Sequence, residues 1–175
     1  MSSSILNIEF KACVNNLPEM EARLRTLNPL FIGEDQQIDT YFVVPSGRLK
    51  LREGNIENAL IHYKRDNTAD AKMSKVLLYK HVPDATLKQI LIHSLGIKIV
   101  VEKRRRIYFI DNVKFHFDTL EQLGTFVEVE AIDENQSRNK TDLQIQCQYY
   151  ADFLGIAPSN YVAESYSDLL MSKAL

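Results

Sequence analysis

Residues 101–131, VEKRRRIYFIDNVKFHFDTLEQLGTFVEVEA, read as three β-strands joined by two tight turns, and this stretch decides the fold. Successive side chains of a strand point to opposite faces, so residues two apart share a face. Each strand then carries a charged pair on one face: Lys103 with Arg105, His116 with Asp118, and Glu128 with Glu130. Cations and acids gathered so densely on one face indicate a site that holds an ion or a phosphate.

The rest of the chain predicts more antiparallel strands and a few helices. Alternation of apolar and polar residues predicts strands at 5–14, 37–44, 48–52, 59–65 and 72–81. Helix caps and breakers predict helices at 18–27, 85–95, 140–154 and 165–172, and residues 66–70 are expected to form a polar loop. No internal repeat or linker stands out, so residues 1–175 are predicted to form a single domain.

Composition restricts the class of protein. The 21 cationic and 23 acidic residues nearly cancel, which argues against a general nucleic-acid binder. Cys13 and Cys147 form neither a metal motif nor a disulfide framework. The N-terminus lacks the pattern of a signal peptide, and no stretch approaches the roughly 20 apolar residues of a membrane span. These features predict a cytoplasmic protein that binds neither membrane nor nucleic acid, and they leave a homodimer open.

Charged residues recur at a spacing of two in six predicted strands. The sets are Glu9 and Lys11; Arg48, Lys50 and Arg52; His62 and Lys64; Lys103 and Arg105; His116 and Asp118; Glu128 and Glu130. Each set alone is typical of the solvent face of an antiparallel sheet. Six sets together, one purely cationic and another purely anionic, favour a sheet closed into a barrel, with the charges inside and the apolar faces packed outward against helices.

A closed interior of this kind requires an occupant that compensates both signs of charge, because buried like charges are costly. A hard divalent cation, Mg²⁺ or Mn²⁺, suits the carboxylates. A polyphosphate suits the arginines and lysines through charge-assisted hydrogen bonds. A metal that bridges the two is the arrangement that phosphoryl and nucleotidyl transfer use.

The chain resembles the CYTH superfamily, the triphosphate tunnel metalloenzymes. Residues 7–11, NIEFK, are similar to the N-terminal ExExK signature of that family, with Asn7 in place of its first glutamate. The resemblance continues through QIDTYFVVPSGRLKLRE (37–53), HYKR (62–65), EKRRRIY (102–108), FHFD (115–118), LGTFVEVE (123–130) and SYSDLL (165–170). The phrases DTYF, GRLKLRE and SYSDLL look more like class IV adenylyl cyclases than like the tunnel triphosphatases.

The resemblance implies an α+β fold: an eight-stranded antiparallel closed β-barrel, or tunnel, with flanking helices. It implies that the catalytic and metal-binding acids are Glu9, Asp118, Glu128 and Glu130. It implies that the triphosphate-binding cations are Lys11, Arg48, Lys50, Lys64, Lys103 and Arg105, with Arg52 in a less defined role. Asn7 keeps an oxygen ligand and removes a charge, which puts the metal stoichiometry in doubt.

The expected function is that of a metal-dependent enzyme acting on a nucleoside triphosphate or another polyphosphate. The leading hypothesis is an adenylyl cyclase that converts ATP to cyclic AMP and pyrophosphate. The alternative is a triphosphatase that hydrolyses inorganic triphosphate, thiamine triphosphate or a nucleoside triphosphate. A non-catalytic module that binds triphosphates or nucleotides is a third hypothesis, since Asn7 could weaken the metal site.

Overall fold

The computed structural model describes residues 5–64, 72–133 and 138–174. Its strands are β1 (Ile5–Cys13), β2 (Leu30–Phe42), β3 (Arg48–Glu53), β4 (Ala59–Lys64), β5 (Lys72–Lys80), β6 (Ile97–Ile110), β7 (Val113–Leu120) and β8 (Gly124–Asp133). Its helices are α1 (Leu17–Arg25), α2 (Ala85–Leu95), α3 (Lys140–Leu154) and α4 (Tyr166–Lys173), with a short 3₁₀ turn, η1 (Pro158–Asn160). The predicted α+β class is confirmed, and the predicted loop at 66–70 lies outside the described residues.

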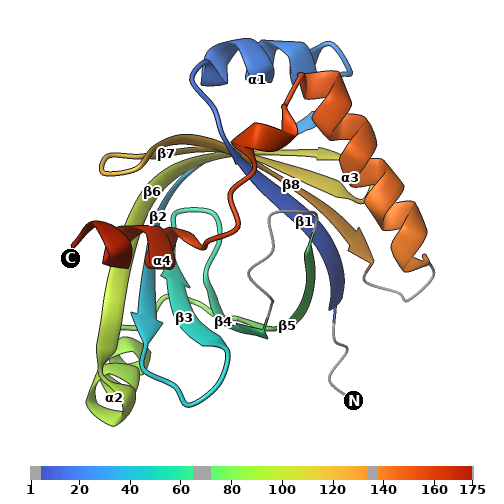
Figure 1. The fold of residues 1–175 in the computed structure, drawn as a ribbon. Coiled ribbons are helices and arrows are strands. Elements are labelled where there is room, and N and C mark those ends of the chain that lie inside the picture. The colour runs from blue at the N-terminus through green and yellow to red at the C-terminus, as the bar shows by residue number, and fades with distance from the viewer. Residues whose placement is uncertain (1–4, 65–71, 134–137, 175) are drawn as a thin grey trace.

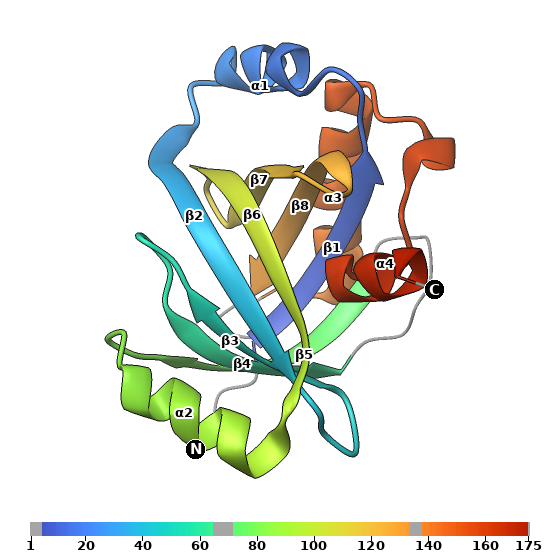
Figure 2. The same ribbon diagram turned by 90° about the vertical axis from the view of Figure 1, so that its left-hand side faces the viewer.

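The eight strands form one antiparallel sheet that curls until its two ends meet. The strand order is β1-β5-β4-β3-β2-β6-β7-β8, and β1 pairs with both β5 and β8. Every strand therefore has a hydrogen-bonded neighbour on each side, which leaves no open edge among the described strands. Figures 1 and 2 show the curl from two directions, with β2 and β6 crossing the front of the second view.

The main hydrophobic core lies outside the sheet, between the sheet and α1 and α3. Ile8 and Phe10 of β1 and Phe115 of β7 turn their side chains to this outer face and are almost fully buried. They pack with Leu24 of α1 and Leu143 of α3. The apolar faces of the strands therefore meet helices, as the alternation predicted, and the opposite faces point into the barrel.

Local sequence explains how the covering helices begin and end. The side chains of Asn16 and Asn139 accept hydrogen bonds from the backbone N–H groups of Glu19 and Asp142, which cap α1 and α3. Helix α3 ends at Gly155, whose φ of 71° lies in the left-handed region that favours glycine. These signals were readable from the sequence, so the helix boundaries agree closely with their prediction.

Strand β2 is longer than the sequence predicted. It begins at Leu30 instead of residue 37, and its pairing with β6 shifts register between Phe31 and Gly33. The first residues, Leu30, Phe31 and Ile32, are all exposed and do not alternate. The irregularity removed the period-two pattern on which strand prediction depends.

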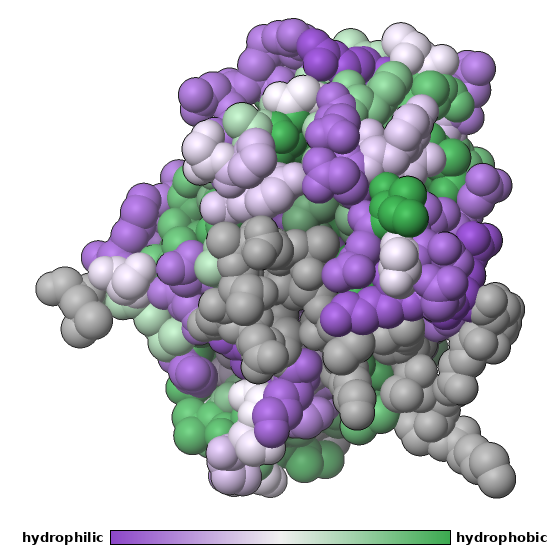
Figure 3. All heavy atoms as spheres, turned by 45° about the vertical axis from the view of Figure 1, so that its right-hand side comes forward, coloured by the Kyte–Doolittle hydropathy of each residue, from purple (hydrophilic) through white to green (hydrophobic). Residues whose placement is uncertain are grey.

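Exposed apolar side chains are distributed over several elements. On the face seen in Figure 3, hydrophobic residues form separate patches among hydrophilic ones. No helix among the described residues has the length and apolar character needed to cross a bilayer.

Candidate active site

The barrel encloses a cavity of about 480 Å³, within the range of roughly 300–1,000 Å³ that is usual for small-molecule sites. Its described lining contains more cationic than acidic side chains. The cations are Lys11, Lys50, Arg52, Lys80, Lys103, Arg105 and Lys114, and the acids are Glu9, Asp39, Glu57, Glu128 and Glu130. The charge excess makes the cavity suitable for an anion, provided that its internal ion pairs can exchange partners.

Asp39 of β2 is the centre of one group of ion pairs. Its carboxylate accepts hydrogen bonds from Lys50 (2.9 Å), from Lys103 (2.7 Å) and, at both oxygens, from Arg52 (2.8 and 2.9 Å). Burial alone would raise the pKa of Asp39, but the three cations hold it well below its ordinary value. Burial lowers the pKa of Lys103 to about 7, although Asp39 opposes this shift. Asp39 thus gathers three candidate phosphate ligands in one place.

Arg105 of β6 forms a second group with two acids from neighbouring strands. Its guanidinium donates to both oxygens of Asp118 (2.7 and 2.5 Å) and to Glu128 (2.7 Å). Tyr166 of α4 donates its hydroxyl proton to Asp118 at 2.7 Å. Asp118 is fully buried, and both of its oxygens accept hydrogen bonds. This carboxylate therefore holds Arg105 in place instead of facing the cavity.

Glu57 enters the cavity from the turn between β3 and β4. The turn is fixed by Asp35, whose two oxygens accept hydrogen bonds from the backbone N–H groups of Ile56 (2.9 Å) and Glu57 (3.0 Å). The Glu57 carboxylate pairs with Arg52 at 2.9 Å and with Lys114. Burial raises the pKa of Glu57, but Lys114 and Arg52 outweigh it and lower the pKa strongly.

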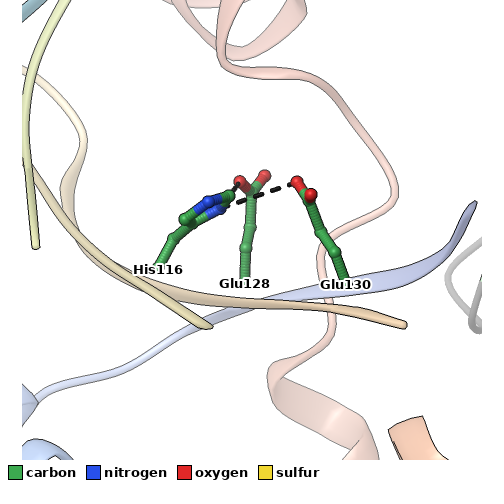
Figure 4. Close-up of side chains that lie close together, drawn as sticks. All are labelled: His116, Glu128 and Glu130. Atoms are coloured by element: carbon green, nitrogen blue, oxygen red, sulfur yellow. Dashed lines mark hydrogen bonds and ion pairs between the residues drawn. The ribbon is translucent and has the colours of Figure 1, made fainter. Parts of the chain in front are cut away.

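An acidic cluster lies on β7 and β8, where His116, Glu128 and Glu130 point toward one another (Figure 4). His116 Nδ1 lies 3.4 Å from Glu128 Oε2 and 3.6 Å from Glu130 Oε1. Burial and the nearby cations Arg105 and Lys114 lower the pKa of His116 to about 3, so the imidazole is neutral at pH 7. Because a carboxylate only accepts, the neutral ring donates its Nδ1 proton to Glu128.

The two glutamates of this cluster have opposite electrostatic environments. Arg105 overcomes the effect of burial on Glu128 and lowers the pKa of that carboxyl. Burial, together with the negative charges of Glu9 and Glu128, raises the pKa of Glu130 to about 7. Glu130 is therefore short of positive charge, which a bound cation would supply.

The residues around Glu130 fit a hard divalent cation. Glu9 of β1 is the register partner of Glu130, and the ligand atoms of His116, Glu128 and Glu130 all lie within 4.8 Å of one another. Asn7, two residues before Glu9 on the same face, has a buried Oδ1 atom with no hydrogen-bond partner. A set dominated by carboxylate and amide oxygens is what Mg²⁺ and Mn²⁺ prefer. Of the four predicted metal ligands, Glu9, Glu128 and Glu130 line the cavity, whereas Asp118 lies behind the lining with both oxygens hydrogen-bonded.

The start of α4 contributes Ser165 and Tyr166 to the cavity lining. Lys11 Nζ donates to the Glu164 carbonyl oxygen at 2.5 Å and lies 4.2 Å from the centre of the Tyr166 ring. Arg48 donates to Asp168 of α4 at 2.7 Å. Ser165 caps α4 in a capping box with Asp168, so this turn is locally well defined. The C-terminal segment thus contacts two of the predicted phosphate ligands.

The structure brings most of the predicted site residues to the cavity. Its lining includes Glu9, Lys11, Lys50, Lys103, Arg105, Glu128 and Glu130. Asp118 lies behind this lining, bonded to Arg105, and Arg48 lies at the side, bonded to Asp168. Lys64 is exposed, outside the set of described residues that line the cavity. Its neighbours explain why: Ala59, Ile61 and Tyr63 take the inner face of β4, which turns His62 and Lys64 outward.

Sequence reasoning missed four residues that organise the cavity: Asp39, Glu57, Lys114 and Tyr166. Lys114 shares a strand face with His116 and Asp118, so alternation alone could have identified it. Asp39 lies two residues from Tyr41 on a predicted strand, where a lone acid gave no pattern. Glu57 comes from a turn, and only the tertiary structure brings that turn to the cavity.

The fold and this cavity define a class of protein: a closed antiparallel barrel whose interior holds cations and acids side by side. The chain belongs to the CYTH domain family, which matches residues 6–166. Adenylate cyclase CyaB of Aeromonas hydrophila is 24% identical, over 93% of this chain and 87% of that protein.

Solved structures with this fold include the following two. The PH1012 protein of Pyrococcus horikoshii has a TM-score of 0.80 and 24% identity, covering 93% of this chain and 98% of that one. RNA triphosphatase Pct1 of Schizosaccharomyces pombe has a TM-score of 0.52 and 11% identity, covering 93% of this chain and 85% of that one. At these identities, both likenesses concern the fold alone.

Proposed function

We propose that this protein is a metal-dependent enzyme acting on a nucleoside triphosphate, and that it converts ATP to cyclic AMP and pyrophosphate. The observation that carries the proposal is the meeting of two groups in one cavity. Lys50, Arg52 and Lys103 gather around Asp39, and the carboxylates of Glu128 and Glu130 lie together on β8 beside His116 of β7. The barrel is the tunnel in which a triphosphate would lie between these groups.

The cations are arranged to take phosphate oxygens. Arg52 and Arg105 each present two N–H donors in a fork that already binds a carboxylate at both oxygens. Phosphate accepts from the same fork, and its higher charge favours it over a carboxylate. Lys11 and Lys50 add ammonium donors to the same lining. Binding would therefore proceed by exchange of internal carboxylates for phosphate oxygens.

The acids supply the other half of the reaction. Glu9, Glu128 and Glu130 would hold Mg²⁺ or Mn²⁺, with Asn7 as an additional oxygen ligand. A divalent cation there neutralises charge on phosphate oxygens and activates the attacking hydroxyl. His116 keeps Glu128 oriented, and Arg105 links Glu128 to the buried Asp118. These contacts hold the site rigid while the ribose hydroxyl lines up with the α-phosphate.

The likeness to adenylate cyclase CyaB, over 93% of this chain, supports cyclisation as the reaction. Hydrolysis is the second candidate, because the same cations and acids could direct water at the γ-phosphate. The shared fold with an RNA triphosphatase shows that one barrel architecture occurs in proteins with that activity too.

Product analysis tests the proposal directly. Purified protein is incubated with ATP and Mg²⁺ or Mn²⁺, and the products are separated by chromatography. Cyclic AMP with pyrophosphate is the expected result, whereas ADP with orthophosphate would establish the triphosphatase instead. Binding of ATP without any product would show a non-catalytic module. A matched Glu128→Gln variant, analysed in parallel, identifies product made by a contaminating enzyme.

A further inference from the structure

The lining of the cavity is divided between a charged side and an apolar side. Strands β1–β3 and β6–β8 contribute charged groups, whereas β4 and β5 contribute Ala59, Ile61, Val76 and Leu78, with Tyr63 near the end of β4 and the cation Lys80 at the end of β5. We call Ala59, Ile61, Val76 and Leu78 the β4–β5 wall. Ile61 is the register partner of Leu78, so two branched apolar side chains lie side by side on the inner face. The sequence analysis expected His62 and Lys64 to point into the barrel from this strand.

Leu78 is the most exposed member of the wall. Its side chain faces the cavity and the residue is 42% exposed, whereas Ala59 and Ile61 are 5% and 8% exposed. The part of this apolar side chain that stays accessible to water in the cavity contributes no burial free energy to the fold. It would gain free energy if an apolar group of a ligand covered it.

The wall is continuous with the candidate phosphate site. Ile61 is the register partner of Lys50 on β3, and Ala59 is the partner of Arg52. A ligand whose phosphates reach Lys50 and Arg52 therefore places its neighbouring atoms against Ile61, one strand away, and Leu78, two strands away. Tyr63, farther along β4, is not part of the wall, because its ring lies beside the Lys50 ammonium and its hydroxyl contacts the Tyr41 hydroxyl.

We propose that the β4–β5 wall binds the organic group of the substrate, a nucleobase or a comparable flat heterocycle, and that Ile61 and Leu78 determine specificity. The inference rests on the proposed triphosphate site and names the part of it that selects the substrate. Inorganic triphosphate is charged along its whole length, so it would gain no contact energy from this wall. A ring laid on branched aliphatic side chains gains dispersion contacts and removes apolar surface from water.

The experiment compares two ligands by isothermal titration calorimetry in the presence of Mn²⁺. One ligand is inorganic triphosphate, and the other is an ATP analogue with a methylene bridge between the α- and β-phosphates. Leu78→Asn removes the accessible apolar surface at a position exposed enough to tolerate the change, and Ile61→Asn is the second variant. Leu77→Asn is the matched control, because Leu77 is 50% exposed and precedes Leu78 on the opposite strand face.

The quantity that decides is the ratio of the two dissociation constants. In the wild type and in Leu77→Asn we expect the ATP analogue to bind more tightly than inorganic triphosphate. In Leu78→Asn this preference should fall about tenfold, as expected for loss of one apolar contact surface. Circular dichroism and thermal melting of each variant establish that the fold is kept.

Three outcomes would overturn the inference while leaving the proposed function intact. They are equal affinities in the wild type, an equal loss of affinity for both ligands in Leu78→Asn, and an equal change in Leu77→Asn. Failure of the wild type to bind either ligand would overturn the triphosphate site itself. The two failures are therefore distinguishable in one set of titrations.

Discussion

Lys103 of β6 donates a hydrogen bond to Asp39 of β2 at 2.7 Å, and both side chains are almost completely buried. The same carboxylate also accepts hydrogen bonds from Lys50 and Arg52, so one acid is shared by three cations, of which Arg52 also pairs with Glu57. A cluster of this composition is stable only while its acid remains charged, because each cation has left water for the barrel interior.

Asp39→Asn should therefore destabilise the ligand-free protein. Removing the charge takes the shared acid away from Lys50, Lys103 and Arg52, of which Arg52 keeps its ion pair with Glu57, and the expected loss is about 3–5 kcal/mol of unfolding free energy. Urea unfolding measures the loss, and Glu102→Gln, an exposed acid next to Lys103 on the opposite face, is the control. Inorganic triphosphate should restore more stability to the variant than to the wild type. An unchanged urea midpoint would show that Asp39 does not hold the cluster together.

Neutralising Glu130 and neutralising Glu128 should change the free energy of unfolding in opposite directions. The pKa of Glu130 is raised from 4.5 to about 7, so its contribution to stability is complete below pH 4.5 and is lost as the pH rises through 7. Glu130→Gln imitates the protonated acid. It should match the wild type near pH 4.5 and exceed it by roughly 3 kcal/mol at pH 8.

The pKa of Glu128 is lowered, so its charged form stabilises the fold, and that contribution is lost as the pH falls. Glu128→Gln should therefore reduce stability at pH 8, where Arg105 loses one of its acidic partners. Urea unfolding with a chelator present, at both pH values, measures the two variants side by side. The electrostatic assignment is wrong if Glu130→Gln is no more stable than the wild type at pH 8.

The family resemblance implied that both Lys50 and Lys64 bind the triphosphate, but the structure places them differently. Lys50 lines the cavity, and Lys64 is exposed. Lys50→Ala should weaken binding of inorganic triphosphate by roughly 10- to 100-fold, as expected for loss of a charge-assisted hydrogen bond. Lys64→Ala should change it by less than about twofold, because an exposed charge is screened by salt. Equal losses, measured by calorimetry, would mean that β4 faces the other way.

Asn7 offers a test of the metal site. Its Oδ1 atom is buried without a hydrogen-bond partner and lies on the face of β1 that carries Glu9. Asn7→Asp adds a negative charge to an oxygen-rich site and should tighten Mn²⁺ binding by about tenfold, since affinity rises with ligand charge. Calorimetry with Mn²⁺ alone measures the change, and Asn112→Asp, in the turn before β7, is the control. Unchanged affinity would exclude Asn7 from the ligand set.

Alternation by itself determined much of the barrel. In β1, β3, β7 and β8 one face is apolar and the other charged, so period two placed Glu9 and Lys50 on charged faces, and the recurrence of such faces in six strands predicted that they point into a barrel. Helix caps such as Asn139 and Gly155 fixed the ends of α3. These are local properties: they depend on the direction of neighbouring side chains and on backbone hydrogen bonds within one turn.

Only the tertiary structure decided which side chains of β4 point into the barrel and which charged residues pair with one another. In ALIHYK both faces of the strand carry apolar residues, so its orientation came from its pairing with β3, where Lys50 meets Ile61. Whether an acid pairs with a cationic side chain or is left for a metal ion depends on distances across strands. These distances pair Asp118 with Arg105 and leave Glu130 with a raised pKa. A sequence records which charges a face carries, whereas Coulomb energy depends on which of them lie within a few ångströms in the folded chain.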